Sequence, residues 1–135
     1  DPVELLARMH DALRSTRGAA VAVARLNLAT GSLRFAGVGN IAATIVTDRG
    51  AKSLASMNGT VGHRVAKIRS DDVQLDPGAL LVMHSDGCKG GWNLLDYPGL
   101  RRRAPLAVAS LLIRDFERGR DDVSVVVARV GTQPG

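Results

Sequence analysis

Residues 80–92 read LLVMHSDGCKGGW, an apolar run that leads straight into an aspartate and a glycine-rich turn. The run predicts a buried strand over residues 79–84, entered through the turn-forming triplet at 76–78. Asp86 therefore stands where a rigid strand meets a flexible loop. An acid that serves only solubility can lie anywhere on a surface, so this placement makes Asp86 the first candidate for a functional residue.

A second apolar run also begins beside acids. Residues 118–130 read RGRDDVSVVVARV, which puts Asp121 and Asp122 ahead of a strand that is apolar on both faces and is therefore expected to be central and fully covered. If this strand is the antiparallel neighbour of the strand at 79–84, Asp86 and Asp121 share one edge of the sheet. Taken alone, Asp86 is more simply explained as part of a turn, and Asp121 and Asp122 as a solvated pair.

Two carboxylates on strand ends suit a hard divalent cation such as Mg²⁺ or Mn²⁺, which prefers oxygen ligands and retains several waters. No Cys-x-x-Cys or His-x-x-x-His pair points to zinc. His84, Ser85 and Asp86 do not make a catalytic triad, because adjacent residues of a strand point to opposite faces. Cys88 lacks the arginine that a cysteine phosphatase loop would need at Leu94, so we expect it to be a packing residue.

The rest of the chain predicts an α+β domain, an antiparallel sheet or sandwich flanked by helices. Residues 1–130 are expected to form the domain and residues 131–135 a flexible tail. The expected elements are a helix from Asp1 to Gly18, three short strands in a meander at 19–26, 32–39 and 40–47, a weaker strand at about 67–75, and a second helix from Pro105 that is capped by Gly119.

Composition narrows the class of protein further. With 135 residues, 45% of them hydrophobic, the chain fits one globular domain with a single core. The net charge of +5 favours acidic or phosphorylated partners. The one cysteine provides no intrachain disulfide, and no apolar run approaches the roughly 20 residues of a membrane span, so a cytoplasmic location is expected.

Four blocks of sequence, in this order, resemble one known family. They are RGAAVAVARLNLATGSLRFAGVGNIAATIV at 17–46, NGTVG at 58–62, LLVMHSDG at 80–87 and RGRDDVSVVVARV at 118–130. Together they resemble the C-terminal two-thirds of a metal-dependent, type-2C protein serine/threonine phosphatase of the bacterial SpoIIE/RsbX-like branch. The spacing between Ser-Asp-Gly and Asp-Asp-Val-Ser is the most specific part of this resemblance.

The resemblance implies roles for individual residues. Asp86 and Asp121 correspond to metal-binding aspartates of the family, while Asp122, Gly87 and Asn40 are candidates for supporting roles. In the family, a water held between two Mg²⁺ or Mn²⁺ ions attacks the phosphorus of phosphoserine or phosphothreonine, so no catalytic side-chain nucleophile is expected. The implied partner is a phosphoprotein, such as a phosphorylated anti-sigma-factor antagonist or another component of stress signalling and sigma-factor regulation.

The resemblance also implies an upstream Asp-Gly-x-Gly-His-Gly block that carries a metal-bridging aspartate, and residues 1–135 contain no such block. The chain is therefore expected to be a fragment of the catalytic domain. Two non-catalytic alternatives stay open: a degenerate phosphatase that binds phosphoprotein, and a basic nucleic-acid-binding module. Against nucleic acid, aromatic residues make up only 3% of the chain and offer no stacking platform. For Asn40 and Asn58, ordinary turn chemistry is favoured over a place at the substrate cleft.

Overall fold

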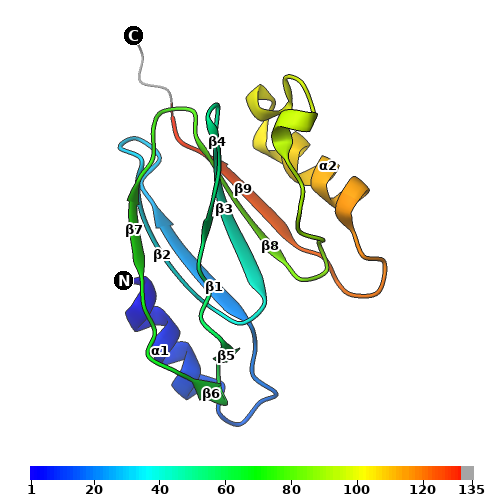
Figure 1. Ribbon diagram of the computed structural model, residues 1–135. Coiled ribbons are helices and arrows are strands. Elements are labelled where there is room, and N and C mark those ends of the chain that lie inside the picture. The colour runs from blue at the N-terminus through cyan, green and yellow to red at the C-terminus, as the bar shows by residue number, and fades with distance from the viewer. Residues whose placement is uncertain (132–135) are drawn as a thin grey trace.

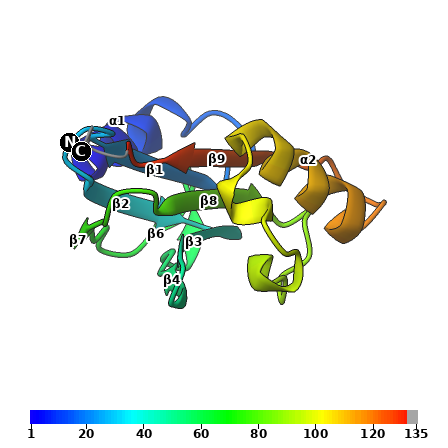
Figure 2. The same ribbon diagram turned by 90° about the horizontal axis from the view of Figure 1, so that it is seen from above.

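The computed structural model of the chain describes residues 1–131, and within them two antiparallel sheets face each other with one helix on each outer side (Figures 1 and 2). The flexible tail predicted for residues 131–135 lies, apart from Gly131, outside the described residues. No helix of residues 1–131 is long and apolar enough to cross a membrane. The α+β class with an antiparallel sandwich is thus confirmed.

The first sheet has the strand order β1-β2-β7, and all its pairings are antiparallel. Helix α1 packs against β1 and β2. Asp1 caps this helix, because its carboxylate accepts a hydrogen bond of 2.8 Å from the Val3 amide. The bounds of these elements are α1 Pro2–Ala12, β1 Val21–Leu26, β2 Ser32–Val38 and β7 Asp71–Gln74.

The second sheet has the order β4-β3-β8-β9 and is also antiparallel throughout. Helix α2 packs against β9. A small hairpin of β5 and β6 stands apart from both sheets. The bounds are β3 Ile41–Thr47, β4 Gly50–Leu54, β5 Gly59–Thr60, β6 Arg64–Val65, β8 Leu80–Ser85, α2 Pro105–Phe116 and β9 Val125–Arg129, with short 3₁₀ turns at η1 Leu94–Asp96 and η2 Leu100–Arg102.

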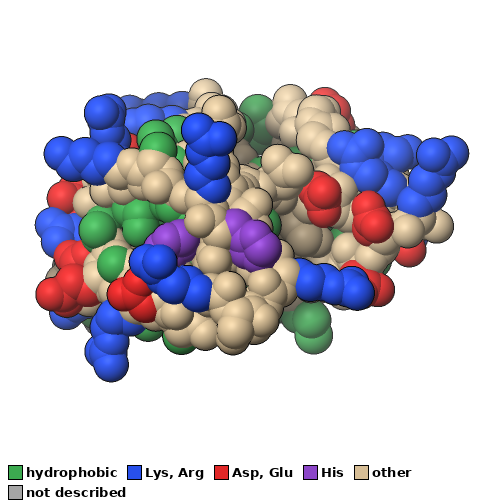
Figure 3. All heavy atoms as spheres, turned by 90° about the horizontal axis from the view of Figure 1, so that it is seen from below, with side chains coloured by type: hydrophobic (Ala, Val, Ile, Leu, Met, Phe, Trp, Pro, Cys, Tyr) green, Lys and Arg blue, Asp and Glu red, His purple; other side chains and the backbone are tan. Residues whose placement is uncertain are grey.

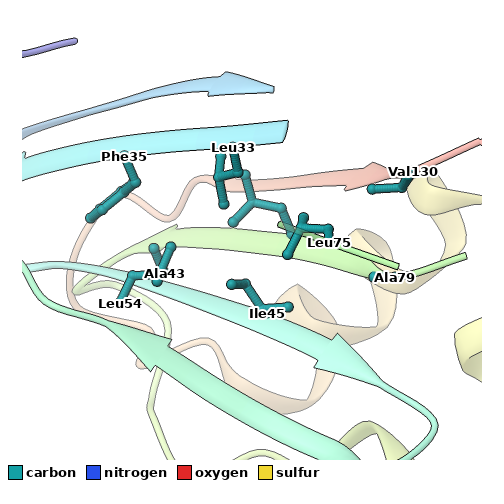
Figure 4. Packing of buried hydrophobic residues seen from close by; sticks show 9 residues of the cluster. Leu33, Phe35, Ala43, Ile45, Leu54, Leu75, Ala79 and Val130 are labelled. Carbon is teal, nitrogen blue, oxygen red and sulfur yellow. The ribbon is translucent and has the colours of Figure 1, made fainter. Parts of the chain in front are cut away.

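The core lies between the sheets and beneath each helix. Phe35 and Leu33 from β2 face Ala43 and Ile45 from β3 across the sandwich (Figure 4). A second apolar cluster under α2 joins Val46, Leu80, Val82, Leu94, Val108 and Leu112. A third cluster under α1 joins Leu6, Ala36, Val38 and Val61. Burial of this apolar area, worth about 25 cal/mol per Å², is the main force that joins the layers.

Several predictions from sequence are wrong in detail. The strands at 19–26, 32–39 and 40–47 do not form a meander, because β3 leaves β2 at Gly39 and pairs with β8 in the other sheet. The first helix ends at Ala12 rather than at Gly18. Helix α2 is capped at Glu117, and Gly119, with a φ of 75°, lies in the turn that follows.

The prediction that the last strand is central and fully covered is also wrong. Within the described residues β9 is an edge strand that pairs with β8 alone. Val125 and Val127 pack into the cluster under α2, whereas Val126, on the opposite face, is 61% exposed. The apolar side chains of this run therefore point alternately to a buried face and to an exposed face of an edge strand.

One ion-pair network ties the start of α1 to the first sheet and gives a prediction in acid. Arg34 donates to Asp72 at 2.6 Å and to Asp1 at 2.7 Å. The hydrogen bond from Arg34 lowers the pKa of Asp72 below its ordinary value. A lowered carboxyl pKa stabilises the fold above the unfolded pKa of about 4, and this stabilisation is lost as the pH falls through the folded pKa.

We therefore expect an NMR pH titration to give Asp72 a midpoint below that of a free aspartate, and Arg34→Gln to move this midpoint upward. Arg25→Gln is the matched control, because Arg25 lies opposite Arg34 on β1 and is not bonded to Asp72. An unchanged Asp72 midpoint in Arg34→Gln would contradict the assignment.

Candidate metal site

Asp86 lies at the tip of a tight turn that closes β8. The Cys88 amide donates to the Ser85 carbonyl at 3.2 Å, so Asp86 and Gly87 are the two central residues of the turn. Strand β8 is paired with β3 on one side and β9 on the other, which makes the base of the turn rigid. The Asp86 side chain is exposed at this tip.

The segment that leads into β9 lies directly against this turn. The Ser85 amide donates to the Ser124 carbonyl at 3.0 Å, and the Ser124 amide donates to the Ser85 hydroxyl at 3.0 Å. A Cβ on Gly87 would overlap the Asp122 carbonyl oxygen, so only glycine allows this approach of the two backbones. The structure thus brings the Ser-Asp-Gly turn and the Asp121-Asp122 segment to one edge of the sheet, as the antiparallel pairing requires.

The segment after α2 supports the same turn from another side. Arg118 donates from Nε to the Asp86 carbonyl at 2.7 Å and from its amide to the Gly87 carbonyl at 2.9 Å. The Lys89 amide donates to the Phe116 carbonyl at 2.7 Å. Seen from below, acidic side chains lie between basic ones on this end of the molecule (Figure 3). Arg118 therefore places a positive charge beside the turn that carries Asp86.

A hollow of about 270 Å³ opens beside Asp86. Asn40 and Asn58 both line it, and Asn40 also lies in the bend between β2 and β3, so the turn role predicted for these two residues stays a prediction. Sequence reasoning missed the other lining residues, which are Ala20, Gly39, Ile41, Gly59, Thr60 and Ser85. A larger hollow, of about 640 Å³, lies on the outer face of the first sheet around the Arg34–Asp72 pair, far from the Ser-Asp-Gly turn.

Two further residues of this region lie in the interior. Cys88 is only 2% exposed, as expected for a packing residue, and burial raises the pKa of its thiol. His84 is buried beneath the turn, with both ring nitrogens within hydrogen-bonding distance of a partner. Neither side chain is placed to act as a nucleophile in the hollow, because neither lines it.

The donor set fits a hard cation in kind. Asp86 and Asp121 offer carboxylate oxygens on exposed turns, which suit Mg²⁺ or Mn²⁺ with water in the remaining positions. In the part of the chain that the structure describes, no group of three or more His, Cys, Asp or Glu side chains is placed to hold a metal ion. The residues present therefore match a hard cation in the chemistry of their oxygen donors, while the described residues alone do not form a complete set of ligands.

The family model of stage II sporulation protein E (SpoIIE) matches residues 1–131. The chain belongs to the SpoIIE family. This match spans all four sequence blocks, and it confirms the resemblance on which the roles of Asp86 and Asp121 were inferred. A comparison with curated proteins finds no match.

Solved structures of the same fold agree with this assignment. A chain from a bacterial stressosome study is 29% identical with a TM-score of 0.82, and the match covers 94% of this chain and 67% of that one. RsbX in complex with magnesium is 16% identical with a TM-score of 0.75, covering 95% and 64%. The phosphatase domain of SpoIIE from Bacillus subtilis is 21% identical with a TM-score of 0.62, covering 100% and 69%. The chain thus shares the type-2C phosphatase fold. It aligns with 64% to 69% of the length of these three solved chains.

The close contact at Gly87 gives a prediction for stability. In Gly87→Ala the new methyl group meets main-chain atoms of Asp122, which cannot rotate away, so we expect a loss of about 1–3 kcal/mol in the free energy of unfolding, as for other overpacked sites. Gly90→Ala is the matched control, because a Cβ there meets nothing within 4 Å. Urea denaturation of both variants checks this, and equal midpoints would contradict the close approach.

Proposed function

We propose that this SpoIIE-family chain is the larger part of a metal-dependent protein phosphatase that hydrolyses phosphoserine or phosphothreonine on a bacterial regulatory phosphoprotein. One observation carries the proposal: the antiparallel pairing of β8 and β9 packs the Ser-Asp-Gly turn against the Asp121-Asp122 segment. Membership of the family and the shared fold support the same reaction class.

Each residue then has a chemical task. Asp86 and Asp121 hold Mg²⁺ or Mn²⁺, and Asp122 adds negative charge beside them. When bound, such ions make a coordinated water more acidic and neutralise charge on the phosphoryl group. Asn40 and Asn58, which line the hollow next to Asp86, offer amide donors to phosphoryl oxygens. Gly87 permits the contact of the two acidic segments.

The proposed partner is a phosphoprotein of stress signalling, such as a phosphorylated anti-sigma-factor antagonist. Support comes from the stressosome origin of one similar structure and from the net charge of +5, which attracts a phosphorylated surface. A partner of this kind implies a cytoplasmic location for the protein.

A degenerate phosphatase that binds phosphoprotein without hydrolysis is the second candidate. It is favoured by one observation, that no group of three metal-ligating side chains occurs among residues 1–131. A nucleic-acid-binding role rests on net charge alone.

The test is phosphate release from a phosphoserine peptide by a chain that extends upstream to a complete phosphatase domain. We expect turnover with Mn²⁺, its loss with EDTA, and its return when Mn²⁺ is restored. Peptide binding without release would favour the degenerate phosphatase. Binding of single-stranded DNA at moderate salt, with no release of phosphate, would favour the nucleic-acid module instead.

A further inference from the structure

His84 is the only polar or charged side chain that is buried within residues 1–131, with 6% of its surface exposed. Its Nε2 lies 3.1 Å from the indole Nε1 of Trp92, and its Nδ1 lies 2.9 Å from the Ser85 carbonyl oxygen. An indole N–H can only donate and a carbonyl oxygen can only accept. The two partners therefore assign the neutral tautomer with the proton on Nδ1.

Ser85, the acceptor in this chain of hydrogen bonds, is a junction of the candidate site. Its carbonyl also accepts from the Cys88 amide and so closes the turn that carries Asp86. Its amide and hydroxyl are both bonded to the main chain of Ser124, at the entrance to β9. A displacement of Ser85 would therefore move Asp86 relative to Asp121.

Trp92 anchors the other end of the chain. Its indole packs against the apolar cluster under α2, and its ring meets the His84 ring edge-on, with 6.0 Å between the ring centroids. An apolar pair could fill the same volume without leaving polar atoms to be satisfied in the interior. The two buried hydrogen bonds, from Trp92 to His84 and from His84 to Ser85, have defined directions and so orient the turn. Apolar packing alone does not impose such an orientation.

We propose that His84 and Trp92 are positioning residues that hold the Ser-Asp-Gly turn so that Asp86 faces the Asp121-Asp122 segment. This inference rests on the proposed function for its effect on phosphate release. The hydrogen-bonded path itself runs from Trp92 Nε1–H to His84 Nε2, and from His84 Nδ1–H to the Ser85 carbonyl.

The first test uses the complete phosphatase domain. Trp92→Phe keeps an aromatic ring and removes the donor, and His84→Leu removes both bonds. Each is expected to raise the Mn²⁺ concentration for half-maximal turnover by about 10-fold, in the range found for partners that orient metal ligands. The KM for the peptide should change little. His84→Asn retains an amide donor near the position of Nδ1 but removes the Nε2 acceptor of the Trp92 indole, so it is expected to behave like Trp92→Phe.

Leu100→Ala is the matched control for packing. Leu100 packs against the same apolar cluster as Trp92, but the hydrogen bond to His84 comes from the Trp92 indole and is retained in this variant. We expect it to lower stability and leave the Mn²⁺ requirement unchanged. A wild-type Mn²⁺ requirement in Trp92→Phe would overturn the proposal. The same rise in Leu100→Ala as in Trp92→Phe would also overturn it, since the effect would then be one of packing.

A second readout needs neither metal nor turnover. Trp92 is the only tryptophan of the chain, so one indole N–H signal in the NMR spectrum reports on its bond to His84. We expect Gly87→Ala, which shifts the turn, to move this signal, and Lys52→Ala, on β4, to leave it in place. An unchanged chemical shift of the Trp92 indole N–H in Gly87→Ala would overturn the positioning role. A responsive signal in a domain that releases no phosphate refutes the proposed function alone.

Discussion

Asp86→Asn and Asp121→Asn, each in a complete phosphatase domain, are expected to reduce Mn²⁺-dependent phosphate release by at least about 100-fold, the upper end of the loss caused by removing a partner of a metal ligand. Each change removes a charged oxygen donor from a set in which ligand number and charge determine cation affinity. Folding should be largely unaffected, because both side chains are exposed and the loss of one carboxylate relieves repulsion. Phosphate release and thermal unfolding, measured on the same preparations, separate the two effects.

Two variants control for the loss of charge. Asp122→Asn should be milder, because Asp122 is proposed to support the site and not to bind the cation directly. Asp48→Asn, in the turn between β3 and β4 at the other end of these strands, should leave turnover unchanged. Complete loss at Asp122 together with retained activity at Asp121 would show that the metal ligand is the second acid of the pair.

Local pattern predicted where most strands lie, since apolar periodicity reflects burial on one or both faces. It did not predict which strands pair. The glycine and asparagine at 39–40 carry the same turn chemistry whether the chain returns within one sheet or crosses to the other. The run at 125–129 is apolar on both faces, yet β9 has neighbours on only one side among the described residues. Pairing depends on contacts between distant segments, which periodicity does not encode.

The acids of the candidate site were found for a different reason. Asp86 and Asp121 stand next to long apolar runs, and the meeting of strand and loop is visible in sequence. Sequence did not predict that the two strands beside these acids, β8 and β9, pair antiparallel, because a strand, helix, strand connection more often joins parallel strands. The structure shows the antiparallel pairing.

The contacts that support these acids were not predictable from local pattern. Ser85 and Ser124 are separated by 39 positions, and the fit of Gly87 against Asp122 depends on the fold. The partner of His84 Nε2 is Trp92, eight residues further along, and periodicity does not show that the loop after β8 brings the two side chains together.

The 135-residue chain by itself is expected to release phosphate at least about 100-fold more slowly than a chain extended upstream to include an Asp-Gly-x-Gly-His-Gly block, because ligand number and charge set the affinity for hard cations. In the proposed site, Asp86 and Asp121 would leave most of a cation's coordination to water, since the described residues contain no group of three metal-ligating side chains. Among residues 1–131, β9 is paired on one side only and Val126 is 61% exposed, so the other side of β9 can accept a further strand. Pairing of such a strand would stabilise the edge that carries Asp121.

The measurement is a Mn²⁺ titration with one phosphoserine peptide, made on both chains at equal concentration. The longer chain with the aspartate of its block changed to asparagine is the matched control, because it restores the extra length without the extra carboxylate. We expect this control to be as slow as the 135-residue chain. Rapid Mn²⁺-dependent turnover by the 135-residue chain would contradict this expectation, and the remaining metal ligands would then have to be sought within the chain itself.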